Sequence, residues 1–129
     1  MFKDTPAFSG FSVDDLAKAK VFYGETLGVD VEEGEMGMLR LKLFGGGEVM
    51  VYPKSDHKPA SYTMLNFVVK DIDKAVDALT AKGVKFEHYD SDMMKQDPKG
   101  IARGKAANMG PDIAWFLDPA GNTLAVLED

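Results

Sequence analysis

Cysteine is absent from this chain of 129 residues, which excludes disulfides, thiolate metal sites and cysteine nucleophiles. Imidazole is nearly absent as well, because only His57 and His88 carry one. No apolar run approaches the length that spans a membrane, and the N-terminus has no basic and apolar signal pattern. We therefore expect a cytoplasmic protein with no membrane partner.

Positive charge is also in short supply, since 15 Lys and Arg face 21 Asp and Glu and the net charge is −6 at pH 7. Nucleic-acid binding depends on clustered Lys and Arg, so this balance argues against a nucleic-acid partner. The apolar share of 45% and the charged share of 28% are those of an ordinary globular protein. The length predicts a single domain over 1–129.

One stretch of the chain occurs twice. The segment FSVDDLAKA, Phe11 to Ala19, recurs as FVVKDIDKA, Phe67 to Ala75, with the same residue at five of the nine positions. Such a repeat indicates one supersecondary unit used twice. In each copy an Asp, Asp15 or Asp71, stands where a helix N-cap belongs, and a glycine follows the apolar stripe of the helix.

Each copy reads as strand, helix, strand, strand, strand. We predict a first module over 7–53, a linker over 54–61 and a second module over 62–129 that contains a long loop over 90–112. The predicted strands are Pro6 to Val13, Val29 to Glu33, Met38 to Phe44, Glu48 to Pro53, Tyr62 to Val69, Val84 to Tyr89, Ile113 to Leu117 and Thr123 to Glu128.

These elements predict an α+β fold, in which two βαβββ modules form a curved, mostly antiparallel sheet of eight strands. The helices then cover the outside, and the concave inner face forms a cup that can take a ligand. The loop over 90–112 lacks steady periodicity and is rich in Asp, Lys, Gly and Met, which is typical of a mobile flap.

The paired modules resemble the vicinal oxygen chelate superfamily, which includes glyoxalase I, extradiol dioxygenases, fosfomycin-resistance enzymes and bleomycin-resistance proteins. The resemblance rests on FSVDDLAKAKVFYGETLGV, on FVVKDIDKAVDALTAKGV and on the closing hairpin IAWFLDPAGNTLAVLED. These motifs and the strands between them cover almost the whole chain. They are specific for the fold but not for a reaction.

The resemblance implies four metal-ligand positions on inward-facing strands, where the metal enzymes of the superfamily mostly carry His or Glu. In this chain the positions are Phe8, Met50, Met64 and Ala125. None of them offers an imidazole or a carboxylate, and a thioether is a poor ligand for Ni, Zn, Mn or Fe(II). We therefore expect no metal and no cofactor.

Strand alternation predicts which side chains line the cup. The predicted ligand-binding residues are Phe8, Glu48, Met50, Tyr52, Met64, Asn66, Trp115 and Ala125. Trp115 fits either the core or a ligand-stacking role, and Met93, Met94 and Met109 add adaptable apolar surface in the flap. The same residues are also compatible with a filled core.

Three functions remain open. The first is a metal-independent binding protein for a small, partly hydrophobic or aromatic molecule. The second is an enzyme with a non-standard site, for example Glu48 with Tyr52 or His57 as acid and base, although no catalytic residue is assigned. The third is a non-catalytic interaction module with a closed cup. The resemblance further implies a homodimer, and the identity of the ligand does not follow from these residues.

Overall fold

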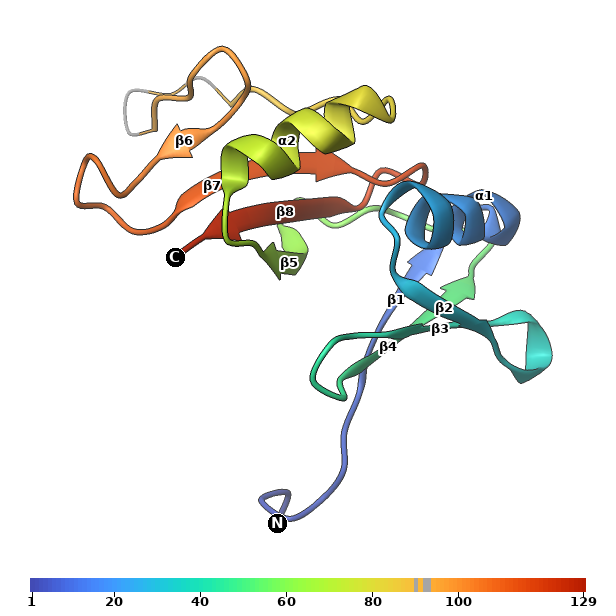
Figure 1. The fold of residues 1–129 in the computed structure, drawn as a ribbon. Helices are drawn as coiled ribbons and strands as arrows, with labels where there is room; N and C mark the ends of the chain where they lie inside the picture. The colour runs from blue at the N-terminus through green and yellow to red at the C-terminus, as the bar shows by residue number, and fades with distance from the viewer. Residues whose placement is uncertain (90, 92–93) are drawn as a thin grey trace. The chain divides into compact units, whose positions relative to one another are not determined.

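The computed structural model describes residues 1–89, 91 and 94–129. The chain divides into two compact units, Met1–Pro59 and Ala60–Asp129, and the division falls inside the stretch 54–61 predicted as a linker. Each unit holds a four-stranded sheet with a helix on it (Figure 1). The predicted α+β class and its two βαβββ modules are confirmed.

The first unit has the strand order β1-β4-β3-β2, in which β1 and β4 are parallel and the other pairs are antiparallel. Its elements are β1 (Ser9–Val13), α1 (Leu16–Val21), the π-helical segment η1 (Phe22–Thr26), β2 (Asp30–Glu33), the short 3-10 segment η2 (Glu35–Gly37), β3 (Leu39–Lys42) and β4 (Glu48–Pro53). The helix predicted after Asp15 is therefore α-helical only as far as Val21 and continues as the wider π-helical segment η1.

The first helix begins as predicted. The Asp15 carboxylate accepts a hydrogen bond from the Lys18 backbone N–H at 3.1 Å, which satisfies one of the amides at the start of the helix. Ala19 and Tyr23 are buried, and the Tyr23 ring packs against Phe11 of β1 with 5.7 Å between ring centroids. The sheet face under this helix is formed by buried residues of three strands: Val13, Leu39, Leu41, Val49 and Val51.

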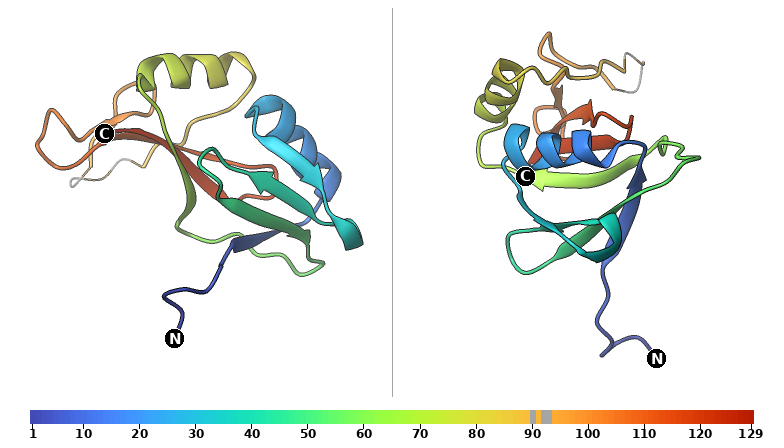
Figure 2. Two further views of the ribbon diagram at one scale, coloured as in Figure 1. Left: turned by 60° about the horizontal axis from the view of Figure 1, so that its bottom comes forward. Right: turned by 90° about the vertical axis from the view of Figure 1, so that its right-hand side faces the viewer.

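The second unit has the order β5-β8-β7-β6, again with one parallel pair, β5 with β8. Its elements are β5 (Thr63–Val68), α2 (Ile72–Ala81), β6 (Ala102–Arg103), β7 (Asp112–Leu117) and β8 (Thr123–Glu128). α2 lies along β7 and β8 on one face of the sheet, as the two views of Figure 2 also show. Among the described residues no helix is long and apolar enough to cross a bilayer.

The second helix repeats the construction of the first. The Asp71 carboxylate accepts from the Lys74 N–H at 3.1 Å, and the Glu128 carboxylate accepts from the Ile72 N–H at 3.0 Å. Ile72 and Val76 of α2 are buried. The sheet residues on this side are also buried: Ala114, Phe116, Leu124 and Val126. Burial of this face provides the main stabilisation of a short helix.

One predicted strand is wrong. The stretch Val84 to Tyr89 forms only an isolated bridge between Phe86 and Phe116, and the fourth strand of the sheet is β6, inside the stretch predicted as a loop. The Gln96 side chain explains the difference, because its amide nitrogen donates to the Glu87 carbonyl at 2.9 Å and its amide oxygen accepts from the Tyr89 N–H. The Gln96 side chain thus occupies the carbonyl of Glu87 and the N–H of Tyr89, which would otherwise pair with a neighbouring strand.

The loop that carries β6 is tied to α2 by charge. Arg103 donates to the two carboxylate oxygens of Asp73 at 2.8 and 3.0 Å and to Asp97 at 2.9 Å. Lys99 adds an ion pair with Asp77 at 2.9 Å. A two-pronged guanidinium pair fixes orientation as well as distance, so this contact sets where β6 lies at the sheet edge.

We expect Asp71→Ala to lower the free energy of unfolding by about 1 kcal/mol, because one helix amide loses its acceptor. Asp71→Asn should keep most of the stability, since the amide oxygen of Asn also accepts. Urea unfolding followed by circular dichroism measures both, with the exposed Asp4→Ala as the control. Equal losses for Ala and Asn would contradict the capping role.

The Asp73–Arg103 contact predicts a pH dependence. Hydrogen bonds from Arg103 hold the pKa of Asp73 below its ordinary value, against the effect of burial. A carboxyl with a lowered pKa stabilises the folded state above its unfolded pKa of about 3.9 and loses this effect as the pH falls through its folded pKa. Asp73→Asn should therefore lower the urea midpoint near neutral pH, and the difference from the wild type should shrink below about pH 4.

The exposed Asp14→Asn is the matched control, because Asp14 makes no ion pair within the described residues. A difference between Asp73→Asn and the wild type that stays constant down to acid pH would show that the lost stability does not come from the charge.

Candidate functional site

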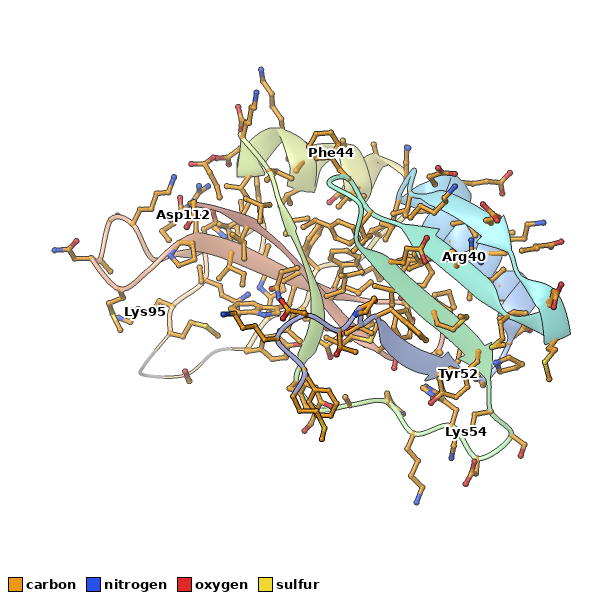
Figure 3. All side chains as sticks on the ribbon, turned by 90° about the horizontal axis from the view of Figure 1, so that it is seen from below. Arg40, Phe44, Tyr52, Lys54, Lys95 and Asp112 are labelled. Carbon is orange, nitrogen blue, oxygen red and sulfur yellow. The ribbon has the colours of Figure 1, made fainter. Side chains whose placement is uncertain are left out.

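In each unit one face of the sheet is turned away from its helix, and we call it the open face. In the first unit it carries Gly10, Ser12, Glu32, Arg40, Lys42, Glu48, Met50 and Tyr52. Along β4 the buried Val49 and Val51 alternate with the more exposed Glu48, Met50 and Tyr52, as predicted from the sequence. Figure 3 shows Arg40 and Tyr52 projecting from this sheet.

Charged side chains neutralise one another over part of this face. Arg40 lies 3.3 Å from Glu32 and 3.7 Å from Glu48, and Lys42 lies 3.1 Å from Glu32. The hydrogen bond from Lys42, together with the charges of Lys42 and Arg40, lowers the pKa of Glu32. Glu48, one of the predicted ligand-binding residues of the cup, is therefore the partner of an arginine from the same sheet.

A second contact on the open face was not foreseen from the sequence. The Nδ1 atom of His57 lies 2.6 Å from the hydroxyl oxygen of Ser12, and Ser12 pairs in register with Tyr52. His57 belongs to the predicted linker, but the Lys54 N–H donates to the Val13 carbonyl and the His57 N–H donates to the Lys54 carbonyl. This turn directs the chain back toward the sheet, so that the imidazole of His57 reaches Ser12 of β1.

The open face of the second unit carries Asn66, Val68, Ile113, Trp115, Ala125 and Leu127. Asn66, Ala125 and Trp115 stand in one row across β5, β8 and β7, so the structure brings three of the predicted residues together. Ala125 is fully buried, which allows it to form only the floor of a site. Asn66 is exposed and Trp115 is half-buried.

Trp115 is held in a fixed orientation. Its indole N–H donates to the Thr63 hydroxyl at 3.0 Å, and its ring meets the Tyr89 ring edge-on with 5.6 Å between centroids. Burial, and to a lesser extent the charge of Glu87, raises the pKa of Tyr89. Tyr89 and Thr63 were not among the predicted site residues, because no periodic pattern links them to Trp115.

The resemblance assigns four positions to metal ligands, and each unit holds two of them. Phe8 stands just before β1 with 70% of its side chain exposed, and Met50 is half-buried on β4. Met64 is half-buried at an irregularity between Thr63 and Leu65, and Ala125 is buried. Phenyl, thioether and methyl groups do not fit a divalent metal. In the part of the chain that the structure describes, no three His, Asp or Glu side chains gather as a metal site requires.

Among the flap methionines, Met94 is half-buried and Met109 is exposed. Met93, which was also predicted to add apolar surface, lies outside the described residues.

Solved structures share this fold. A superfamily member from Sphaerobacter thermophilus DSM 20745 has a TM-score of 0.66 and 24% identity, covering 96% of this chain and 98% of that chain. TnmS3, described as an antibiotic binding protein from Streptomyces sp. CB03234, has a TM-score of 0.65 and 25% identity, with 97% of each chain covered. The fosfomycin resistance protein FosX from Listeria monocytogenes has a TM-score of 0.69 and 12% identity, covering 98% and 93%.

No curated protein sequence matches the chain. A sequence model of one protein family matches residues 9–126, which include both repeats and most of the closing hairpin. The chain therefore belongs to the Glyoxalase/Bleomycin resistance protein/Dioxygenase superfamily.

Proposed function

We propose that this protein binds a small, partly hydrophobic or aromatic molecule on its open faces and needs no metal to do so. The observation that carries the proposal is the residue set at the four superfamily ligand positions, Phe8, Met50, Met64 and Ala125. Each has an apolar side chain, so these positions lack the groups for metal chemistry and suit contacts with an apolar ligand.

The neighbourhood of Trp115 supports the same proposal. A half-buried indole that is oriented by Thr63 and Tyr89 offers a flat surface for an aromatic ring, and the exposed Asn66 in the same row offers an amide. Aromatic pairs contribute about 0.5–1.5 kcal/mol beyond the area that they bury. TnmS3, which is 25% identical, is described as an antibiotic binding protein, and binding of this kind needs no reaction.

An enzyme with a non-standard site is the alternative that a specific contact favours. The hydrogen bond between Ser12 and His57 gives a hydroxyl and a base within 2.6 Å, next to Tyr52 and two residues from Met50 in the pairing register. With Glu48 in its ion pair with Arg40, His57 is the better candidate for the base. Turnover that survives both His57→Gln and Glu48→Gln would exclude these two residues as the base, and the absence of turnover with any substrate tested would count against the enzyme itself.

The third alternative is an interaction module. Large apolar side chains that are exposed, such as Phe44 and Val68, are its only support.

We also propose a homodimer in the cytoplasm, on the strength of the superfamily resemblance and the absence of a spanning helix among the described residues. Sedimentation measurements test the dimer directly.

The binding proposal predicts the outcome of a ligand screen. Compounds with one or two aromatic rings should raise the unfolding temperature at saturation, because a ligand at 100 times its Kd stabilises the folded state by about 2.7 kcal/mol. Since Trp115 is the only tryptophan of the chain, its fluorescence should change on binding. Trp115→Leu should weaken the best compound about five- to tenfold.

Phe44→Leu is the control, because Phe44 is a fully exposed aromatic residue in a hairpin turn of the other unit. The proposal fails if no compound stabilises the protein, or if Trp115→Leu binds the best compound as tightly as the wild type does.

Metal independence is tested separately. Elemental analysis of the purified protein after dialysis without chelator should show Ni, Zn, Mn and Fe well below one equivalent. Adding a chelator should leave the affinity for the best compound unchanged. One equivalent of a tightly bound metal would mean that other residues supply its ligands, and it would make the superfamily's metal chemistry the leading explanation.

A further inference from the structure

The second unit contains a pocket that none of the eight predicted ligand-binding residues lines. It has a volume of about 630 Å³ and lies beside β6 and the start of β7, under the loop that carries Met94 and Met109. Its apolar lining comes from Met94, Ala102, Ala107, Met109, Pro111 and Ile113. The volume falls within the range of roughly 300–1,000 Å³ that is typical of pockets for small molecules.

Two of the polar side chains that line the pocket, Gln96 and Asp97, are already engaged in hydrogen bonds. The Gln96 amide donates to the carbonyls of Glu87 and Gly100 and accepts from the Tyr89 N–H. Both carboxylate oxygens of Asp97 accept hydrogen bonds, one from backbone amides and the other from Arg103. These groups shape the pocket, but they have little capacity left to bind a ligand.

The loop that supplies Gly104, Ala107 and Met109 to the lining is closed by its own backbone. The Met109 N–H donates to the Gly104 carbonyl at 2.8 Å, and a Cβ placed on Gly104 would lie only 2.3 Å from the Pro111 carbonyl oxygen. Only glycine allows this approach, which fixes the course of the loop that brings Ala107 and Met109 into the pocket lining. The contact of Arg103 with Asp73 anchors the other side. Binding to a pocket that is already formed costs less conformational entropy, because fewer side chains and loop residues have to be ordered.

Lys95 distinguishes the pocket from a purely apolar one. It lines the pocket, it is exposed, and it makes no ion pair with any residue that the structure describes. Of the other charged lining residues, Asp97 and Arg103 pair with each other at 2.9 Å. Lys95 is labelled on the loop of this unit in Figure 3, and its ammonium group is the charged group of the lining that has no partner among the described residues.

We propose that this pocket binds a small apolar or aromatic molecule that carries one anionic group, a carboxylate or a sulfonate. The apolar body fills the space among the methionines, Ala107 and Ile113, and the anionic group pairs with Lys95. The thioethers adapt to more than one ligand shape, so the charge of Lys95 supplies selectivity that the apolar walls lack.

Two fluorescent probes that differ in one group test the proposal. Anilinonaphthalene sulfonate has an aromatic body and a sulfonate, and its uncharged parent, N-phenylnaphthylamine, has the same body without the sulfonate. We expect one saturable site for the sulfonate probe in the folded protein. Lys95→Met should weaken the sulfonate probe about three- to fivefold and leave the parent unchanged. Lys85→Met, an exposed lysine of the same unit, is the matched control.

Ala107→Phe tests the location. Ala107 is exposed, so a larger side chain there fills the pocket without disturbing the core. The variant should abolish binding of both probes and keep the unfolding temperature of the wild type. Trp115→Leu should leave both probes bound, which separates this site from the open face around Trp115.

Four results would overturn the proposal. The first is saturable binding of the sulfonate probe that Ala107→Phe does not affect, and the second is an equal loss of both probes in Lys95→Met. The third is a change of molecular mass in Ala107→Phe, measured by sedimentation without probe, since it would mean that a second copy of the chain occupies this surface. The absence of any saturable binding to the folded wild type would also refute it.

Discussion

The structure depends on one face of each sheet being covered by the helix that follows its first strand. The parallel pairing of β1 with β4, and of β5 with β8, requires the chain to leave the sheet and return. Asp15 and Asp71 begin the helices at that departure, and apolar residues spaced for a helix lie over buried sheet residues. Because each helix covers only one face, the other face of each sheet is left to the side chains of Met50, Tyr52, Asn66 and Trp115.

The charged groups near these surfaces are largely paired with one another. Arg40 lies against Glu32 and Glu48, Arg103 against Asp73 and Asp97, and Lys105 lies 2.6 Å from Glu128. Exposed pairs of this kind contribute little to stability, but they leave few charges for a ligand. What remains is an indole, thioethers, a phenol and an amide on the open faces, and the ammonium group of Lys95 at the pocket. These mostly apolar and uncharged groups favour ligands with an apolar body and few polar groups.

The repeat made much of the fold predictable. Two Asp caps, the glycines after the helices and the alternation in β4 are local signals, and the structure confirms each of them. The stretch 84–89 was not predictable in the same way, because its alternation is that of a strand but its backbone partners come from Gln96. The Ser12–His57 contact and the pocket beside β6 depend on loop conformations that no periodicity encodes. Of the predicted site residues, Asn66, Trp115 and Ala125 share a row because they lie on regular strands.

The wrong strand and the unforeseen pocket have a common physical origin. If 84–89 had paired fully with β7, the sheet edge would be occupied and the chain over 94–111 would have no place beside Ile113. Gln96 instead takes the backbone groups of Glu87, Tyr89 and Gly100, and β6 pairs with β7 through only two residues, Ala102 with Ile113 and Arg103 with Asp112. A short edge strand followed by the tight loop at Gly104 leaves space between the loop and the sheet. The hydrogen bonds of Gln96 that prevent a strand over 84–89 therefore also leave room for the apolar pocket. Because the sequence of 84–89 alternates as a strand does, it gives no indication of that pocket.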